Sequence, residues 1–588
     1  MNKILLKALP LFFIIGMTSC TKMQKNISLD GVDTTNPVTG DWLVMHELSD
    51  PQRLNPYTAS DASAQKIYQL IFESLLYLDP ERVELVPNLA ESMPTLSEDH
   101  LTYTFLLKKN VKFSDGKPLT AKDVIFSFKA LKNPLVLDAA SLRGYFIDVA
   151  DVTAPDDYTV IVKMLKPSYL ALYSLGTDLR ILPKHILDPK NLTDKYTFAE
   201  TNDIDLAEKN ASLKEFADWF GKVEIGREAK YLIGSGPYIM EAWRTEEYVK
   251  IKRNENYWNG TNNKWAIAHA DRLVFKTVND RTSAVSAVKN GDLDFMDYVP
   301  PRMFDELLDT AATPYLKKVV YNIPTYMYIG WNTRRAIFKD KRVRHALSHL
   351  VDRDMLIKNV MLGYANTIDG PVTRTRPEYN TDMKPHEYNP TLSKQLLKEA
   401  GWEDTDGNGI LDKMIDGKKV EFTFNILLNA GNETRENIAV ILVNEFKKVG
   451  IKAGIQRLEW SVFLENLDTY QFDAMIGAWV NDPTPPDLYQ LWHTSQATNK
   501  GSNYTGFGNA QTDKMIEDIR VEFDDARRTQ LLKDIQAAIY DEQTYTFLWV
   551  MQYPAVYHKR IMGANFYPPR PGYVLPTFWV PRQLQVYD

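Results

Sequence analysis

The sequence predicts an α/β protein with more than one domain. Segments typical of strands alternate with segments typical of helices along the whole chain, without a repeat period of about 20–50 residues that would indicate a solenoid. The chain has 588 residues, of which 44% are hydrophobic, so it can build two or three separate cores. Long chains of this class often bind a ligand in a cleft between domains.

The start of the chain has the layout of a secretory signal. Lys3 and Lys7 provide positive charge, residues 8–17 are mostly apolar, and small residues at 18–19 precede Cys20, the only cysteine in the chain. The apolar stretch is too short to be interpreted as a membrane-spanning helix. We therefore predict export.

The residues around Cys20 resemble a bacterial lipobox, with methionine at the position where leucine is usual. This resemblance implies that residues 1–19 are a signal peptide and that Cys20 becomes the acylated N-terminus. Residues 20–39 are polar and lack periodicity, as expected for a tether between lipid and folded body. The protein would then be anchored to a bacterial membrane and face the periplasm or the cell exterior. An ordinary signal with an incidental thiol explains the same residues.

The charge of the chain argues against a nucleic-acid partner. The formal net charge is −7, and cleavage before Cys20 would remove Lys3 and Lys7 and make the chain more acidic. No later stretch approaches the roughly 18 consecutive apolar residues that a membrane span needs. We expect a monomer that contacts the membrane through its lipid alone.

The elements along the chain can be assigned from local patterns. Residues 42–45 resemble a strand, and residues 102–107 are rich in β-forming side chains. Thr120 and Asp123 form a capping-box-like start to a helix that ends at residues 133–134, Asn-Pro.

Two further helices and one strand follow in the second half. Apolar residues at helical spacing predict a helix that starts near Lys341, and another covers residues 391–400 with Gly401 as its C-terminal glycine. Residues 420–426 are predicted to form a strand. Polar, irregular stretches lie near residues 188–230 and 365–390.

Motifs of catalytic chemistry are incomplete. The chain has no Gly-x-Ser-x-Gly elbow and no phosphate loop of the Gly-x-x-x-x-Gly-Lys type. His46 begins a metalloprotease-like run at the end of a strand-like segment, but Asp50 stands where the second histidine belongs. His345 and His349 are four residues apart on a predicted helix and could share a metal, although surface or packing histidines explain them too. We expect no enzyme activity and no cofactor.

One segment resembles the start of a calcium loop. Oxygen-bearing side chains stand at loop positions 1, 3, 5 and 9, with glycine at position 6: Asp404, Asp406, Asn408 and Asp412. Position 12, where a bidentate glutamate is expected, holds Ile415. An Asx- and Gly-rich turn between the helix ending at Gly401 and the following strand explains the same residues, and we favour the turn.

Four segments, in order, resemble the family 5 extracellular solute-binding proteins, the dipeptide- and oligopeptide-binding components of ABC importers. They are residues 101–128, Gly234-Ser-Gly-Pro-Tyr238 followed by Arg253-Asn254 and Tyr257-Trp258, the run from Trp331 through Arg342-Val-Arg-His-Ala-Leu347 to Asp352-Arg353, and Leu396-Leu-Lys-Glu-Ala-Gly401. Together they place nearly the whole mature chain in this family. The motifs themselves are typical of turns, helix caps and strand entries rather than of ligand contacts.

The resemblance implies a two-lobed periplasmic-binding-protein fold, similar to class II, with an extra subdomain in the larger lobe and two crossover segments. The expected parts are the signal peptide (1–19), the tether (20–39), the first part of lobe 1 (40–80), its inserted subdomain (81–229), its second part (230–315), lobe 2 (316–557) and the C-terminal part of lobe 1 (558–588).

The resemblance also implies a peptide ligand and ABC permease subunits as partners. Peptide-binding members hold the ligand amine with an acid in a motif like W-x-x-D-Y-x-D/E-P, which residues 479–487 match in part. Asp482 stands at the anchoring position, but a proline follows it, and the second acid has moved to Asp487. Two acids in a proline-rich turn are the alternative interpretation.

Neighbouring residues complete the expected site. Trp479 and Tyr504 are candidates for its walls, because aromatic rings provide rigid contact area, and Asn481 is a further candidate ligand contact. Arg374 and Arg376 could bind a peptide carboxylate, although we favour a solvated loop as the interpretation of this stretch. The alternative function is a binder of oligosaccharides or metal chelates on the same fold. A lipid-anchored hydrolase is a further, less favoured alternative.

Overall fold

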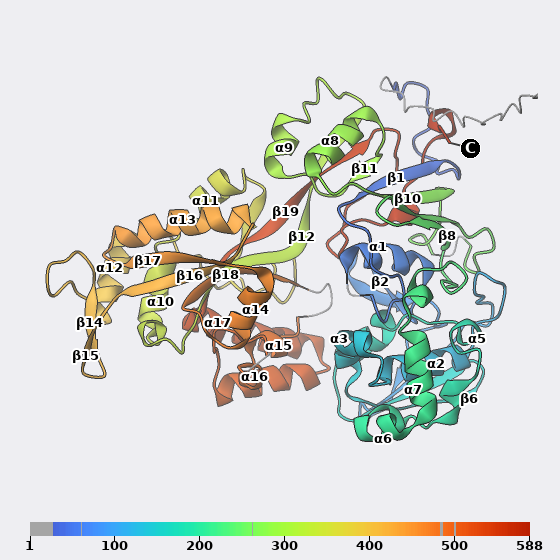
Figure 1. Cartoon of the computed structure of the whole chain (residues 1–588), viewed down its shortest axis with the longest axis horizontal. Helices are drawn as coiled ribbons and strands as arrows, with labels where there is room; N and C mark the ends of the chain where they lie inside the picture. The colour runs from blue at the N-terminus through green and yellow to red at the C-terminus, as the bar shows by residue number, and fades with distance from the viewer. Residues whose placement is uncertain (1–26, 60, 261–262, 482–485, 499–500, 588) are drawn as a thin grey trace, which may run out of the picture.

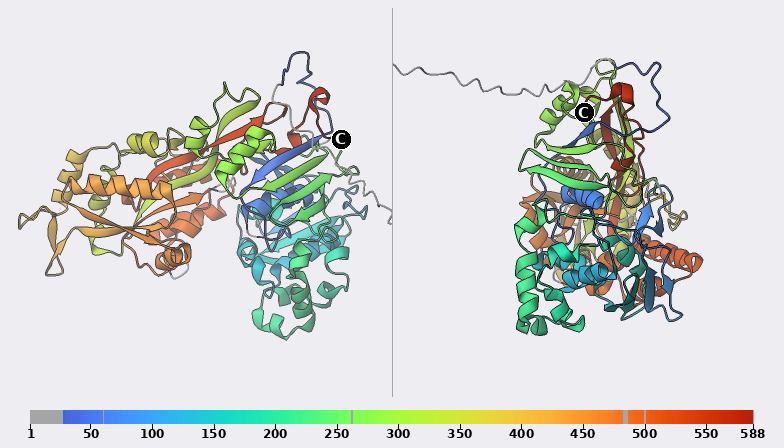
Figure 2. Two further views of the ribbon diagram at one scale, coloured as in Figure 1. Left: turned by 45° about the horizontal axis from the view of Figure 1, so that its top comes forward. Right: turned by 90° about the vertical axis from the view of Figure 1, so that its right-hand side faces the viewer.

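A computed structural model describes residues 27–587 except for 60, 261–262, 482–485 and 499–500. The chain forms two lobes that lie side by side and share one long sheet (Figures 1 and 2). Cys20 and Asp482 lie outside the described residues. Within those residues, no helix is both long and apolar enough to cross a membrane.

A single eleven-stranded sheet runs through both lobes, in the order β17-β16-β18-β12-β19-β11-β1-β10-β9-β8, with β13 paired to β19. Its strands are β1 (Trp42–Glu47), β8 (Tyr238–Arg244), β9 (Tyr248–Arg253), β10 (Arg272–Thr277), β11 (Phe295–Met296), β12 (Leu316–Trp331), β13 (Ala365–Thr367), β16 (Thr423–Asn429), β17 (Lys452–Leu458), β18 (Ala474–Val480) and β19 (Tyr545–His558). The long antiparallel pair β12 and β19 passes from one lobe to the other and supplies the two crossovers (Figure 1).

Lobe 1 combines its part of the long sheet with an inserted subdomain. Helices α1 (Ala62–Ile71), α8 (Arg281–Asn290) and α9 (Pro301–Glu306) accompany the long sheet, and β2 (Leu76–Asp79) pairs with β3 (Glu84–Pro87). The subdomain has a four-stranded antiparallel sheet of β4 (Thr95–Leu96), β5 (Thr102–Leu106), β7 (Thr159–Met164) and β6 (Val149–Asp156). Its helices are α2 (Ala121–Lys132), α3 (Ala140–Arg143), α4 (Ala171–Tyr173), α5 (Lys184–Leu187), α6 (Ile204–Lys209) and α7 (Ala211–Phe220).

Lobe 2 has helices on both faces of the sheet (Figure 1). One core contains side chains of α10 (Lys341–Ser348), α11 (Arg353–Val360), α12 (Pro390–Glu399) and α13 (Glu433–Lys447). The other contains side chains of α14 (Trp460–Asp468), α15 (Tyr489–Trp492), α16 (Ala510–Val521) and α17 (Asp525–Glu542). The hairpin β14 (Asp412–Ile415) and β15 (Lys418–Glu421) extends from this lobe.

Strand β12 shows why this sheet is covered on both faces. Met327 and Ile329 contribute to the first of these cores, while Tyr326 and Tyr328 contribute to the second. Successive side chains of a strand point to opposite faces, so a strand with apolar residues at every position needs a helix layer on each side.

Several predicted elements are confirmed with small shifts at their ends. Helix α2 covers the predicted segment, and the Asp123 carboxylate accepts a hydrogen bond from the Thr120 N–H at 2.9 Å. Helix α10 starts at Lys341, and α12 ends one residue before Ala400, with Gly401 at φ +82°. The predicted strand at 420–426 is wrong as a single element, because β15 ends at Glu421 and β16 starts at Thr423 in a different sheet.

The Gly-Ser-Gly-Pro-Tyr motif has a structural role, as expected. A Cβ atom at Gly234 would lie 1.8 Å from the carbonyl oxygen of Ile71, so only glycine fits against the end of α1. The Tyr-Trp motif is also structural: Tyr257 and Trp258 donate hydrogen bonds to the buried Glu73 carboxylate at 2.7 and 2.8 Å. These contacts join α1 to the second part of lobe 1.

A buried ion cluster joins three distant parts of the chain in lobe 1. Arg560 forms ion pairs with Asp41 and with Asp294, and the three side chains are fully buried. The same guanidinium donates to the Trp42 carbonyl at 2.9 Å, and Asp294 accepts from the Val44 N–H at 2.8 Å. The cluster therefore holds the start of β1, the segment before β11 and the C-terminal tail in one place.

Candidate ligand-binding cleft

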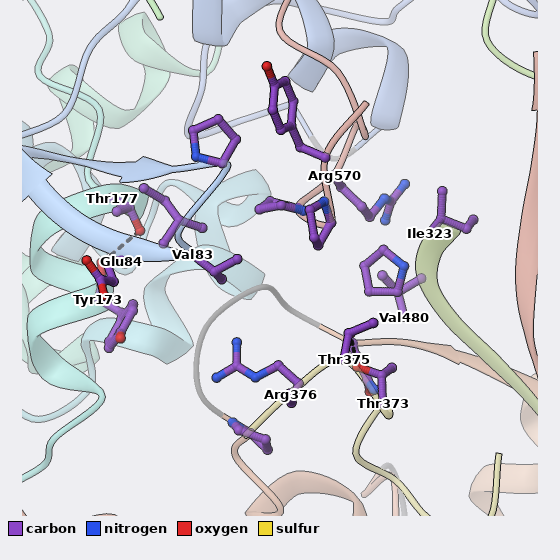
Figure 3. Close-up of a pocket in the computed structure, with 18 of the residues that line it drawn as sticks. Val83, Glu84, Tyr173, Thr177, Ile323, Thr373, Thr375, Arg376, Val480 and Arg570 are labelled. Atoms are coloured by element: carbon purple, nitrogen blue, oxygen red, sulfur yellow. Dashed lines mark hydrogen bonds between the residues drawn. The ribbon is translucent and has the colours of Figure 1, made fainter. Parts of the chain in front are cut away.

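A large cleft lies between the two lobes, with a volume of about 1950 Å³. Lobe 1 and lobe 2 supply opposite walls, and β12 lies at one end (Figure 3). Labelled residues of the two walls are Val83, Glu84, Tyr173 and Thr177 on one side and Thr373, Thr375, Arg376 and Val480 on the other. In the described part of the lining there is no histidine or cysteine, so a nucleophile with an imidazole base cannot be assembled from these residues.

A partly buried charge cluster borders the cleft on the lobe 1 side, where Lys66 and Tyr573 belong to the lining. The Lys66 ammonium lies 3.0 Å from Glu47 and 2.7 Å from Asp297, and Tyr573 donates to Asp297 at 3.0 Å. Burial by itself lowers the pKa of Lys66, but the charges of Asp297 and Glu47 outweigh it and raise the pKa above its usual value. Lys66 is therefore a cation whose charge is already neutralised by protein carboxylates.

The predicted segment at the end of β18 lines the cleft. The Trp479 ring stacks on Tyr504 at 6.0 Å between centroids, and its Nε1 donates to the Tyr545 hydroxyl at 3.3 Å. Asn481 donates through Nδ2 to the Pro371 carbonyl at 2.9 Å. Trp479 and Asn481 belong to the lining, whereas Tyr504 packs behind Trp479 and supports it. The segment therefore carries Trp479 and Asn481 to the cleft directly before Asp482.

Asp487 lines the cleft but has a protein partner. Its carboxylate lies 3.2 Å from the Arg520 guanidinium and accepts a hydrogen bond from the Tyr489 N–H at 3.1 Å. Arg520 also covers the Tyr489 ring at 4.5 Å. Asp487 therefore already has a protein counter-charge, which a ligand amine would have to displace.

Arg374 and Arg376 both line the cleft, and each is paired with a carboxylate of the same loop. Arg374 forms an ion pair with the buried Asp369, and Arg376 lies 3.1 Å from Glu378. About half of the Arg374 side chain is exposed. A ligand carboxylate would therefore compete with Asp369 or Glu378 for these guanidinium groups.

Sequence reasoning missed two other arginines of the cleft, Arg180 and Arg570. Both line it, and neither forms an ion pair with a described residue. Arg570 follows Pro568 and Pro569 in the C-terminal part, and Figure 3 shows it near Ile323 of β12. A proline-rich run with a single arginine was the available signal, but nothing local places it in the cleft.

A second contact between the lobes lies away from the crossover strands. Tyr169 of the inserted subdomain donates its N–H to the Arg520 carbonyl at 3.1 Å and its hydroxyl to the Pro486 carbonyl at 3.2 Å. The Arg528 guanidinium lies 4.3 Å from the centre of its ring. Only 6% of Tyr169 is exposed, because it packs into the core of lobe 2.

This interlobe contact is extended by His100, whose ring stacks on Phe523 at 3.9 Å. The lobes thus meet at Tyr169 and His100 as well as through β12 and β19. The contact stabilises the present arrangement of the lobes.

We expect Tyr169→Ala to weaken this arrangement, since the substitution removes an aromatic side chain whose burial stabilises by about 3–5 kcal/mol in a core. Small-angle X-ray scattering of the ligand-free protein should show a larger radius of gyration. Tyr169→Phe, which keeps the ring and loses only the bond to Pro486, should show a smaller increase. An unchanged scattering curve for Tyr169→Ala would rule out a role in lobe closure.

The predicted calcium loop is folded around a lysine. Carboxylate oxygens of Asp404, Asp406 and Asp412 lie within 4.8 Å of one another, but the Lys419 ammonium is 2.7 Å from Asp406 and 3.1 Å from Asp412. Its hydrogen bond lowers the pKa of Asp406. Asn408 uses its side-chain oxygen to accept from the Ile410 N–H at 2.8 Å. These contacts favour the turn interpretation.

We expect EDTA to leave the melting temperature of the protein unchanged, because Lys419 supplies the positive charge that a cation would bring to this loop. Differential scanning calorimetry with and without Ca²⁺ tests this. A fall of more than about 2 °C on adding EDTA, which corresponds to roughly 1 kcal/mol, would instead support a calcium site. Asp404→Ala should then abolish the difference.

Comparison with known proteins places this fold and cleft in a defined class. Residues 84–502 match the model of the bacterial extracellular solute-binding proteins, family 5. The chain belongs to this family, which comprises solute-binding components of ABC transporters. The resemblance noted in the sequence is thereby confirmed, and so is the two-lobed fold.

Particular relatives are similar over almost their whole length. The oligopeptide-binding protein AppA of Bacillus subtilis is 32% identical over 579 residues, which cover 96% of each chain. Its structure in complex with a nonapeptide has a TM-score of 0.70 at 30% identity and covers 93% of this chain and 100% of its own. The heme-binding protein A of Haemophilus influenzae is 25% identical over 500 residues, 82% of each chain.

Proposed function

We propose that this protein captures peptides in the cleft between its lobes and delivers them to the permease of an ABC importer. The observation that supports this most directly is the cleft of about 1950 Å³, larger than the roughly 300–1,000 Å³ typical of small-molecule sites. The similarity to an oligopeptide-binding protein, over 96% of each chain, agrees with a ligand of that size.

The ligand would be held by groups that do not depend on its side chains. In this proposal Asp482 binds the amine, as an opposite charge with hydrogen-bond capacity should. Trp479 provides a rigid wall beside it, and Asn481 is already fixed by its bond to Pro371. Arg374, Arg376 and Arg570, the last without an ion pair among the described residues, offer guanidinium groups to a carboxylate. The protein binds and releases the peptide without cleaving it.

Native mass spectrometry of the protein as purified from its own cells tests the proposal. A peptide should appear as an added mass that is released on gentle activation and can be sequenced. An added mass that corresponds to a sugar, a heme or a metal chelate would replace the peptide with that solute on the same fold. Cleavage fragments after incubation with the same peptide would point to the hydrolase alternative.

The lipid anchor and the domain boundaries are proposed together with this function. We propose that Cys20 carries the lipid and that the mature protein is an exported monomer whose tether covers residues 20–39. The boundaries given above for the inserted subdomain and the two lobes are proposed with it. Cys20→Ser should move the protein from the membrane fraction to the soluble fraction, because its lipid is the sole proposed anchor.

A binder of another solute is the second candidate. A relative that is 25% identical to this chain is named a heme-binding protein, so the named ligands differ among the relatives. The absence of histidine and cysteine from the described part of the cleft lining argues against direct metal coordination there. The Asp482 experiment described below separates a peptide from a neutral sugar.

A further inference from the structure

Three histidines meet in lobe 2, outside the cleft. His345 and His349 lie one turn apart on and directly after α10, and His386 comes from the loop between β13 and α12. The centre of the His386 ring is 5.1 Å from the centres of both other rings. None of the three lines the ligand cleft. The tertiary structure therefore supplies the third imidazole that the sequence left unplaced.

Backbone carbonyls define which ring nitrogens carry protons. His345 Nε2 lies 2.8 Å from the Asp541 carbonyl, which can only accept, so Nε2 is the protonated nitrogen. His349 Nδ1 lies 2.8 Å from the Glu387 carbonyl and is protonated for the same reason. In the neutral rings, His345 Nδ1 and His349 Nε2 are therefore the nitrogens that carry the lone pairs.

This arrangement is the one found around metal-binding imidazoles. A histidine that binds a metal through one nitrogen nearly always donates its other N–H to a carbonyl or carboxylate, which sets the tautomer and orients the ring. His345 and His349 each have such a carbonyl partner before any metal is bound. Their spacing of four residues, with His345 on α10 and His349 directly after it, also matches a common pair of zinc ligands.

His386 is already directed at the lone pair of His345. Its Nε2 is 2.9 Å from His345 Nδ1 and donates a hydrogen bond to it. The 2.9 Å distance between these two nitrogens is close to the separation of two ligand atoms on one ion, since each zinc–nitrogen bond is about 2.0–2.1 Å long. If the proton of His386 moves to Nδ1, both nitrogens present lone pairs to the same point.

One adjustment is required. Within the described residues, only the carboxylates of the Asp404 loop form a group of three such ligand atoms within 4.8 Å. His349 must therefore turn toward the other two rings, which moves its Nδ1 away from the Glu387 carbonyl, so only His345 keeps its present carbonyl partner. His349 is only half-buried, so this rotation needs no repacking of the core. His386, by contrast, is held by Tyr540, whose ring lies 4.8 Å away and whose hydroxyl donates to the Lys384 carbonyl.

We propose that His345, His349 and His386 form a binding site for a divalent transition-metal ion of the Zn²⁺ type. The ion replaces the proton shared by His345 and His386, which moves to His386 Nδ1, so no net proton is released from the neutral pair. Imidazole ligands suit zinc, copper and nickel and are unsuited to calcium or magnesium. This site is independent of the solute bound in the cleft.

The position of the site gives it a structural consequence. His386 lies in the same loop as Arg374 and Arg376, and the Arg353 guanidinium connects α11 to the start of this loop through Asp369 at 2.8 Å. An ion that joins His386 to α10 would restrict the end of the loop whose beginning lines the cleft. Zinc should therefore raise the melting temperature of the intact protein.

Calorimetric titration of the tag-free, chelator-treated protein with ZnCl₂ alone tests the proposal. We expect one equivalent of zinc to bind, and the affinity to fall at least about 10-fold in His386→Ala. Removing a residue that only orients a metal ligand already costs about 10- to 100-fold in affinity. His185→Ala, which removes a histidine paired with Asp115 in the other lobe, is the matched control and should bind as the wild type does.

Two further variants keep the outcome decisive. His349→Ala replaces a half-buried side chain and should reduce zinc affinity even if His386→Ala does not fold. Asp406→Asn should not change the affinity, which separates the histidines from the carboxylates of the Asp404 loop. No heat of zinc binding in the wild type, or equal affinities for the wild type and His349→Ala, would overturn the proposal.

Discussion

Arg560→Met is expected to lower the free energy of unfolding by about 3–5 kcal/mol, the cost typical of breaking a buried ion pair from one side. Asp41 and Asp294 would be left without their shared cation, and both carboxylates are fully buried. Burial already raises the pKa of Asp294, and the loss of the Arg560 charge would raise it further. The buried carboxyl would then have to take up a proton or remain as an unpaired charge. Urea-induced unfolding followed by circular dichroism measures the loss.

The matched control for this variant is Arg302→Met. Its side chain is 78% exposed, and its pair with Glu306 is 3.9 Å long, so the substitution should change the stability by about 0.5 kcal/mol or less. If Arg560→Met unfolds at the same urea concentration as the control, the three-residue cluster does not stabilise lobe 1.

Asp482→Ala is expected to reduce peptide affinity by about 2–5 kcal/mol, or roughly 30- to 4,000-fold, and this expectation depends on the proposed function. The reason is that the ligand amine would enter the cleft without a counter-charge. Calorimetry with the peptide identified by mass spectrometry measures the change. Asp487→Ala should have a smaller effect, because Asp487 is already paired with Arg520 at 3.2 Å.

An N-acetylated version of the same peptide provides a second control. Acetylation removes the amine charge, so it should weaken binding to the wild type and have little further effect on Asp482→Ala. If both peptides bind the wild type equally, Asp482 is not the amine anchor, even if the cleft binds peptides. If a neutral sugar binds and Asp482→Ala leaves its affinity unchanged, the sugar-binding alternative replaces the peptide.

Local signals predicted much of the secondary structure. The capping pair Thr120 and Asp123, the glycine at 401 and the Asn-Pro stop at 133–134 each act within a few residues, so their effect is visible in the sequence. The strand prediction at 420–426 failed because two short strands of different sheets follow one another with only Phe422 between them. No glycine or proline separates the two strands, so only their pairing distinguishes them.

Candidate site residues were predictable only where a motif carried them. Trp479 and Asn481 line the cleft, whereas Tyr504 lies behind the lining and Asp487 has a protein partner. Arg570 and Lys66 were missed because their neighbours in space are distant in sequence. Asp297, for example, is 231 residues from Lys66.

By itself, the sequence determined the class and the family of this protein, because the family motifs follow one another in order along the chain. It also determined where helices and turns begin and end, because those signals act within a few residues. The tertiary structure decided which charges are free and which are paired. Asp487, Arg374 and Lys66 all have the chemistry of ligand contacts, yet Arg520, Asp369 and Asp297 already pair with them. It also decided that His386 joins His345 and His349. Such pairings depend on distances between segments that the fold alone brings together.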